Sequence, residues 1–256
     1  EAALRRAFAP DDLAPLLART GYGGTVAVQA REVEAETGYL LSLARTTPSI
    51  LGVVGWVDLC AADVEDRLDR AAADPKLRGL RMVIHDHPDR DFAASPGHVR
   101  GVSALAARGL TYDLLIRTEH IPAALVLVDA CPDVRFVVDH LAKPRLDGSD
   151  WSPWRAGIDA LGARPNVWCK LSGLGTLPGP GRPHRFLDTA LAAFGPARCM
   201  IGSDWPVATL AADYAGTMAV VEAWCAPLAP DERALILGET CARFYRLDRG
   251  EDRLQV

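Results

Sequence analysis

The sequence predicts an α/β protein whose parallel strands close into a (β/α)8 barrel, the TIM-barrel architecture. Seven short apolar runs, rich in β-branched residues, alternate with helical segments at a mean interval of about 29 residues, as one βα unit requires. Polar residues close nearly every run, and no Gly-x-Gly-x-x-Gly motif follows the first one. A barrel gathers all its carboxyl strand ends around one mouth, whereas an open doubly wound sheet has a switch point, so this distribution favours the barrel.

The expected elements follow one another in a regular order within one domain, residues 1–256. Nearly continuous apolar runs, typical of strands covered by helices, lie at residues 25–30, 50–59, 79–85, 111–116, 135–140, 167–172 and 199–205. Helical spacing of apolar residues marks 11–19, 61–73, 98–108, 119–130, 153–162 and 185–194. A helix that leads into the first visible strand implies a strand before it. We therefore expect the first barrel strand to be missing from this chain, so that the domain is N-terminally incomplete.

Composition excludes several classes of partner. The 28 Lys and Arg residues are balanced by 33 Asp and Glu, for a formal net charge of −5, and no basic cluster suggests nucleic acid or an anionic membrane surface. No apolar run approaches the ~18 residues that a membrane span needs. Six scattered cysteines without a Cys-x-x-Cys pair are typical of a reducing compartment. We expect a cytoplasmic protein with a small-molecule partner; oligomeric state leaves no signal here.

The segment around Asp204 is the most informative part of the chain. Pro206 has no N–H to donate to a sheet and disfavours a helical conformation at Trp205, so the strand must end and Asp204 lies at its tip. An acidic residue there predicts a catalytic carboxylate, with Trp205 beside it as a substrate contact. The alternative is that Asp204 only caps the following helix.

His140 closes a second strand of the same construction. By alternation Phe136, Val138 and His140 share one side, and Asp139 faces the other. His140 is therefore expected at the mouth, where a histidine ligates metal or transfers protons. A packing role is the alternative.

Lys170 lies inside an apolar strand, where a lysine is disfavoured unless it meets a charge or a polar cavity. Alternation groups it with Trp168 and Ser172. We expect Lys170 to bind substrate oxygens at the mouth, with a buried structural ion pair as the alternative.

Four further residues complete the candidate substrate contacts. Gln29 ends the first visible strand, and Arg81 lies in the strand that leads to His85 and His87. A His-x-His pair is a common zinc motif, but this one runs into a polar loop. We therefore interpret both histidines as loop or rim groups that contact substrate.

Four motifs together resemble the amidohydrolase-related family, and within it the branch of L-fuconolactonase-like, L-rhamnono-lactonase-like and 2-pyrone-4,6-dicarboxylate lactonase-like proteins. They are Val-Val-Gly-Trp-Val-Asp-Leu at 53–59, Val-Asp-His-Leu-Ala-Lys-Pro at 138–144, Cys-Lys-Leu-Ser-Gly at 169–173 and Gly-Ser-Asp-Trp-Pro at 202–206. The resemblance runs from about residue 8 to residue 245. It implies a (β/α)8 barrel that hydrolyses a cyclic ester.

The resemblance also implies roles for individual residues. Asp204 matches the family's strand-eight aspartate and His140 its strand-six histidine, while no residue here matches the family's strand-one His-x-His. Asp204 and His140 would then be the ligands of any divalent ion, zinc before others, although members of this branch also work without metal.

Lactone hydrolysis needs a base for water, a group that stabilises the oxyanion, and a proton for the departing alkoxide. We assign Asp204 as the base and His140, Lys170 or a metal ion as the electrophile. Gln29, Arg81 and Ser172 are then available to hold sugar hydroxyls. The predicted function is therefore hydrolysis of a sugar-acid lactone. Decarboxylation or amide hydrolysis by the same superfamily, or a catalytically silent barrel that binds sugar acids, are the alternatives.

Overall fold

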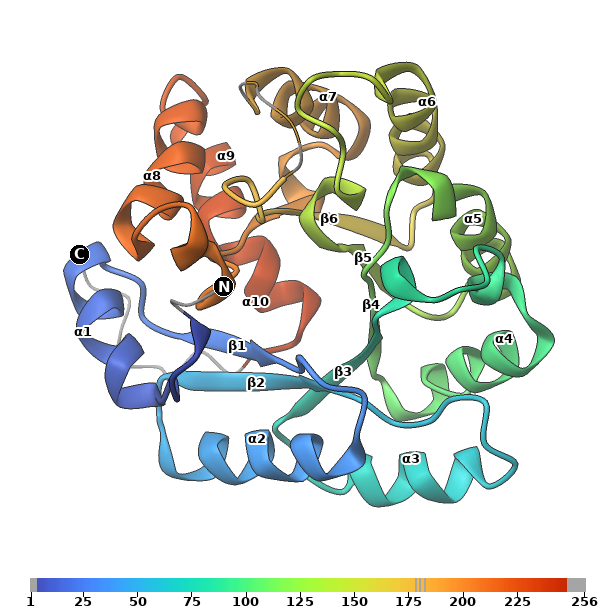
Figure 1. The fold of residues 1–256 in the computed structure, drawn as a ribbon. Coiled ribbons are helices and arrows are strands. Elements are labelled where there is room, and N and C mark those ends of the chain that lie inside the picture. Colours follow the sequence, from blue (N-terminus) through green and yellow to red (C-terminus); the bar gives the residue numbers. More distant parts are fainter. Residues whose placement is uncertain (1–3, 178, 180, 182, 248–256) are drawn as a thin grey trace.

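A single parallel sheet of seven strands organises the protein (Figure 1). The computed structural model describes residues 4–177, 179, 181 and 183–247. Neighbouring strands pair in chain order: β1 (Thr25–Val28), β2 (Ile50–Gly55), β3 (Leu77–Met82), β4 (Thr111–Leu114), β5 (Phe136–Val138), β6 (Val167–Leu171) and β7 (Cys199–Ile201). Each begins at or within two residues of its predicted start. The predicted α/β class with a parallel sheet is confirmed, although several strands end earlier than expected.

Helices cover the outside of the curled sheet, except for the last one, which packs at the hollow of the sheet (Figure 1). They are α1 (Pro10–Thr20), α2 (Glu34–Thr46), α3 (Val64–Ala72), α4 (Pro96–Ser103), α5 (Ile121–Ala130), α6 (Trp151–Gly162), α7 (His184–Phe194), α8 (Tyr214–Cys225), α9 (Pro230–Ala234) and α10 (Thr240–Phe244). A π-helical turn, Leu235–Glu239, joins α9 to α10. None of the helices in the described part of the chain combines the length and hydropathy that a membrane span requires.

The curl of the sheet follows from the packing of its inner face. Val54 of β2, Val137 of β5 and Met200 of β7 belong to one buried cluster with Phe244 and Tyr245. These strands are not neighbours in the sheet, so their side chains meet only if the sheet bends around them. The end of α10 and the residue after it thus help to fill the hollow of the sheet.

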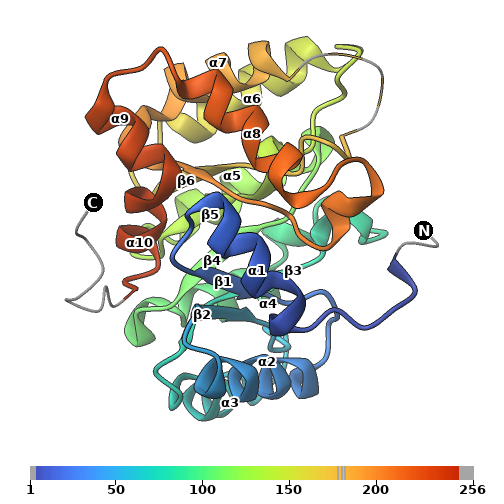
Figure 2. The ribbon, with the colours of Figure 1, turned by 90° about the vertical axis from the view of Figure 1, so that its left-hand side faces the viewer.

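The two edge strands are bridged by helices. Within the described residues β1 and β7 form no ladder with each other. Between them α1 packs against α8 through Leu17, Tyr214 and Met218, and the two helices lie side by side in Figure 2. The Tyr22 hydroxyl also donates a hydrogen bond to Glu222, at 2.9 Å. A curled sheet is thus observed, and closure by an eighth strand stays a prediction.

A left-handed turn follows β5. Four consecutive residues other than glycine, from His140 to Lys143, have φ values of 52°, 59°, 58° and 48°. Each such conformation costs roughly 1–2 kcal/mol for an L-residue. The Lys143 N–H donates to the His140 carbonyl at 2.8 Å, and the buried Trp154 indole of α6 donates to the Leu141 carbonyl at 2.7 Å. Contacts from outside the turn therefore hold it in place.

We expect Trp154→Phe to destabilise the protein by about 1–3 kcal/mol, because the buried Leu141 carbonyl loses its donor. Urea unfolding at pH 7 measures this change. Trp224→Phe is the matched control, since the Trp224 indole donates to Asp188 at an exposed position, at 2.7 Å. Equal losses in the two variants would contradict a specific role for Trp154 in holding the turn.

Candidate active site

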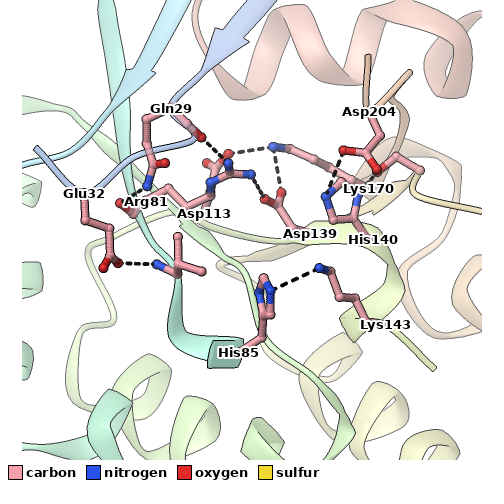
Figure 3. A network of polar contacts seen from close by, with 12 residues as sticks. Gln29, Glu32, Arg81, His85, Asp113, Asp139, His140, Lys143, Lys170 and Asp204 are labelled. Carbon is pink, nitrogen blue, oxygen red and sulfur yellow. Dashed lines mark hydrogen bonds and ion pairs between the residues drawn. The ribbon is translucent and has the colours of Figure 1, made fainter. Parts of the chain in front are cut away.

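Polar side chains from six strands or the segments after them meet at the carboxyl end of the sheet (Figure 3). They belong to β1, β3, β4, β5, β6 and β7, and they include Gln29, Arg81, His85, Asp113, Asp139, His140, Lys143, Lys170 and Asp204. Carboxyl ends of parallel strands carry the active sites of barrel enzymes. This cluster is therefore the candidate active site.

Asp204 and His140 face each other across this end of the sheet. The Asp204 Oδ1 atom lies 3.6 Å from His140 Nε2, and the side chains are 17% and 11% exposed. Asp204 follows β7 with a φ of 52°, in the left-handed region. On the other side of the ring, His140 Nδ1 lies 2.8 Å from the Ser172 hydroxyl, just after β6. The two residues predicted as catalytic thus share one partly open site.

The predicted alternation placed His140 on the same side as Phe136 and Val138, facing the site, and this prediction was wrong. His140 reaches the site for another reason. Phe136 and Val138 pack outward in the main core, and Asp139 instead points into the hollow of the sheet. His140 begins the left-handed turn after β5, so its side chain leaves the strand pattern and also turns toward the site. Period-two alternation ends where extended backbone ends.

A buried cluster of charges lies directly beside this pair. The Asp139 carboxylate is 2.8 Å from Arg81 Nη1 and 2.7 Å from Lys170 Nζ. Lys170 Nζ also lies 2.6 Å from Asp113 Oδ2, which accepts a hydrogen bond from the Tyr245 hydroxyl at 2.8 Å. Both aspartates are fully buried. Two cations and two carboxyl groups thus compensate one another inside the sheet.

Burial and pairing act in opposite directions on these groups. Burial raises the pKa of Asp113 above its usual range. Burial also disfavours the charged form of Asp139, but Lys170 and Arg81 outweigh it and hold the pKa of Asp139 well below its usual range. Burial lowers the pKa of Lys170 by itself, and the two carboxylates more than reverse this, so the net shift is upward. Lys170 is therefore a firmly held cation.

Several residues that were predicted to contact substrate form hydrogen bonds or ion pairs with other residues of the protein. Lys170 forms the buried ion pair that was the alternative to a role at the mouth. Arg81 binds Asp139 and the Gln29 carbonyl, and Gln29 Nε2 donates in return to the Arg81 carbonyl at 3.0 Å. The Gln29 Oε1 atom is buried and has no hydrogen-bond partner among the described residues. The substrate roles of these residues, and of Ser172, stay predictions.

Trp205 and His87, two predicted substrate contacts, pack against other aromatic rings. Trp205 packs edge-on against Phe8, with ring centroids 5.4 Å apart. His87 stacks on Phe92 at 4.1 Å, whereas His85 lies in a short turn after β3 with its Nε2 atom 3.3 Å from Lys143 Nζ. The two histidines lie in the turn and loop after β3, and their contact with substrate stays a prediction.

The helix-capping alternative for Asp204 is not what the structure shows. Asp213 caps α8, where its carboxylate accepts a hydrogen bond from the Gly216 N–H at 2.7 Å. Asp204 lies farther from that helix, and its carboxylate instead faces His140.

Asp204 and His140 are the candidate ligands for a metal ion in this site. Catalytic zinc usually has three protein ligands. The described residues contain no group of three His, Cys, Asp or Glu side chains able to hold a metal ion, and Asp204 with His140 supplies two. These residues alone do not fit a zinc centre.

Four functional candidates were missed from the sequence: Asp113, Asp139, Lys143 and Tyr245. Asp113 lies within the apolar run 111–116, so it could have been found as Lys170 was, as a charged residue inside an apolar strand. Asp139 was assigned to the wrong face, and Lys143 received no role beyond its place in the motif at 138–144. Tyr245 follows α10 and reaches Asp113 only through the fold, 132 residues away in sequence.

Comparison with known proteins agrees with this geometry. The amidohydrolase family model matches residues 1–247. The chain belongs to the amidohydrolase family. An L-fucono-1,5-lactonase from Burkholderia ambifaria is 40% identical over 96% of this chain and 88% of that protein, and one from Burkholderia multivorans is 38% identical over 97% and 89%. A crystal structure of a Burkholderia multivorans amidohydrolase with bound zinc superimposes with a TM-score of 0.90, at 38% identity over 96% of this chain and 91% of that one.

We expect Lys170→Met to destabilise this amidohydrolase by about 3–5 kcal/mol, because two buried carboxyl groups lose their shared cation. Urea unfolding at pH 7 measures the loss. Adding Asp113→Asn to this variant should recover part of the stability, since one of the two carboxylates is then removed. Strictly additive losses in the double variant would show that Lys170 and Asp113 are not coupled.

Acid should weaken the fold through His85. Burial and the neighbouring Lys143 lower the pKa of His85 to about 4, below its unfolded value of about 6.5. Neutral His85 therefore contributes stability that is complete above pH 6.5 and is lost as the pH falls toward 4. His85→Asn should reduce the slope of unfolding free energy in that range by up to about 1.4 kcal/mol per pH unit.

The matched control is His87→Asn in the same loop. A slope equally reduced in both variants would contradict this assignment. The slope should persist in part, because burial also lowers the pKa of His98 and of His140.

Proposed function

We propose that this amidohydrolase opens a sugar-acid lactone by attack of a base-activated water on the ring ester. The observation that carries the proposal is the Asp204 carboxylate held against His140 at the carboxyl end of the sheet, in a partly open position. Two relatives named as L-fucono-1,5-lactonases, similar over nearly the whole chain, support this substrate class.

His140 has a hydrogen bond with Ser172 on one side and the Asp204 carboxylate 3.6 Å away on the other, and these two contacts suggest how the pair works. An ionised carboxylate only accepts hydrogen bonds, so we assign the ring proton to Nε2, facing Asp204. The other nitrogen, Nδ1, then accepts from the Ser172 hydroxyl. Burial lowers the pKa of His140, which favours this neutral ring. Ser172 thus selects the tautomer, and His140 orients the catalytic carboxylate.

In the proposed reaction, Asp204 takes a proton from water as the oxygen attacks the lactone carbonyl carbon. The tetrahedral intermediate carries its charge on the former carbonyl oxygen. Its collapse breaks the ring carbon–oxygen bond, and Asp204 returns the proton to the departing alkoxide. The product is an open-chain hydroxy acid. An ester alkoxide leaves more readily than an amide nitrogen, so the proposed reaction uses one carboxylate with modest electrophilic help.

Three further proposals concern a metal ion, the closure of the barrel and the cellular location. A divalent ion would use Asp204 and His140 together with at least one further ligand, and a similar protein holds zinc. The curled sheet suggests an eight-stranded barrel with a further strand between β7 and β1. All six cysteines are unpaired, which supports a cytoplasmic location.

Asp204→Asn should lower kcat/KM for L-fucono-1,5-lactone by about 10²- to 10⁴-fold, the usual contribution of a general base. A pH indicator follows acid release. Asp213→Asn is the control: it neutralises a carboxylate in the same loop region while asparagine still caps the helix, so stability and kcat/KM should change little.

Two results would reject lactone hydrolysis. One is a wild-type protein that opens no aldonolactone faster than Asp204→Asn. The other is release of carbon dioxide from an aromatic acid in place of ring opening, which would assign the protein to decarboxylation.

A further inference from the structure

Lys143 differs from the other two lysines of the chain in its partners. Lys170 is bound by Asp113 and Asp139, and Lys76 donates to the Ile50 carbonyl at 3.0 Å. Lys143 is half-buried, and among the described residues no carboxylate lies within ion-pair distance of its ammonium group. Its contact is with the His85 ring, 3.3 Å away. It is thus a partly desolvated cation with a weak partner.

The left-handed turn directs Lys143 toward the site. His140 and Lys143 are three residues apart in one helical turn, closed by the hydrogen bond from the Lys143 N–H to the His140 carbonyl. Residues at this spacing project from the same side of a helical turn. In Figure 3, Lys143 and His85 point toward each other beside the pair of His140 and Asp204.

Electrostatics agrees with this placement. The charge of Lys143 lowers the pKa of His140, and Asp204 favours the charged form of Lys143. Burial and the nearby Arg117 lower the pKa of Lys143. His85 is neutral at pH 7. Its ring can therefore accept a hydrogen bond from the ammonium group of Lys143, but it does not compensate the positive charge.

A half-buried ammonium group without a carboxylate is costly, and so is its left-handed backbone, with φ at 48°. Such costs are typical of positions where a ligand supplies the missing partner. An anionic oxygen that approaches between Lys143 and Asp204 would complete the charge balance of the site.

We propose that Lys143, oriented by His85, binds the carboxylate of the ring-opened sugar acid and, during the reaction, the oxygen of the lactone carbonyl. This inference rests on the proposed function and deepens it. It moves the substrate-binding cation from Lys170, which is occupied by two buried aspartates, to a lysine at the edge of the same site. Lys143 is then the group that stabilises the oxyanion, while Asp204 accepts the proton of water and returns it to the alkoxide.

The binding test uses L-fuconate, the open-chain acid, and the whole chain. Isothermal titration calorimetry should show that Lys143→Met weakens L-fuconate binding about ten- to hundredfold, because a charge-assisted hydrogen bond is lost. Lys143→Arg should retain most of the affinity, since the positive charge remains. Lys76→Met is the matched control, because Lys76 lies at the opposite end of β3. Urea unfolding of each variant confirms that it is folded.

Kinetics supplies a second readout. Lys143→Met should lower kcat/KM for L-fucono-1,5-lactone by about 10²- to 10³-fold, as expected for loss of an oxyanion contact. Lys143→Arg should recover product binding more than kcat, because a planar guanidinium does not reproduce the position of the ammonium group.

The outcomes separate the two proposals. If wild-type protein opens no lactone but binds L-fuconate in a manner that depends on Lys143, the reaction is wrong and the binding site stands. If folded Lys143→Met binds L-fuconate and hydrolyses lactone as the wild type does, the site is wrong and the reaction stands. Equal losses in Lys76→Met and Lys143→Met would also overturn the site.

Discussion

The compensated charge cluster inside the sheet is the constraint on which the site depends. Asp113 and Asp139 are fully buried, and an unpaired carboxylate there would cost several kcal/mol. They are compensated only when Lys170 of β6 and Arg81 of β3 reach them from opposite sides. That happens in one register and one curvature of the sheet. The cluster therefore ties four strands together just beneath Asp204 and His140.

The interior is arranged in layers along the strands. Val137, Met200 and Phe244 form an apolar layer, which excludes water from below. The charge cluster forms the next layer, and Tyr245 joins the two through its ring and its hydroxyl. Such layers of inward side chains are a general feature of parallel barrels. A site built on these layers has little freedom to shift, which suits catalysis that depends on placement.

The turn after β5 connects the charge cluster to the candidate active site. Asp139 is anchored in the cluster, and the next residue enters the left-handed turn, so His140 and Lys143 emerge at the mouth from a fixed origin. The backbone strain is offset by contacts from α6 and β6, through Trp154 and Ser172. A residue pair three apart thus supplies both a neutral imidazole and a cation on one side of the site. Asp204 approaches from β7, itself in a left-handed conformation.

Local patterns in the sequence were enough to locate the strands, most helices, and the two residues that face each other as Asp204 and His140. Hydrophobic periodicity and proline act within a few residues, so they are readable along the chain. Lys170 was recognised as inward-facing by the same logic. Its partner was not predicted, because Asp113 lies 57 residues away and meets it only across the curled sheet.

Only the tertiary structure decided which lysine is free to meet a ligand and which way Asp139 and His140 turn. Positive φ angles at residues other than glycine are unfavourable locally and leave no pattern in the sequence. They persist because distant groups, the Trp154 indole and the Ser172 hydroxyl, hold the turn. The sequence by itself determined the strands and helices and the polar residues at the strand ends. Long-range hydrogen bonds and ion pairs determined how those polar side chains are oriented and which of them pair with one another.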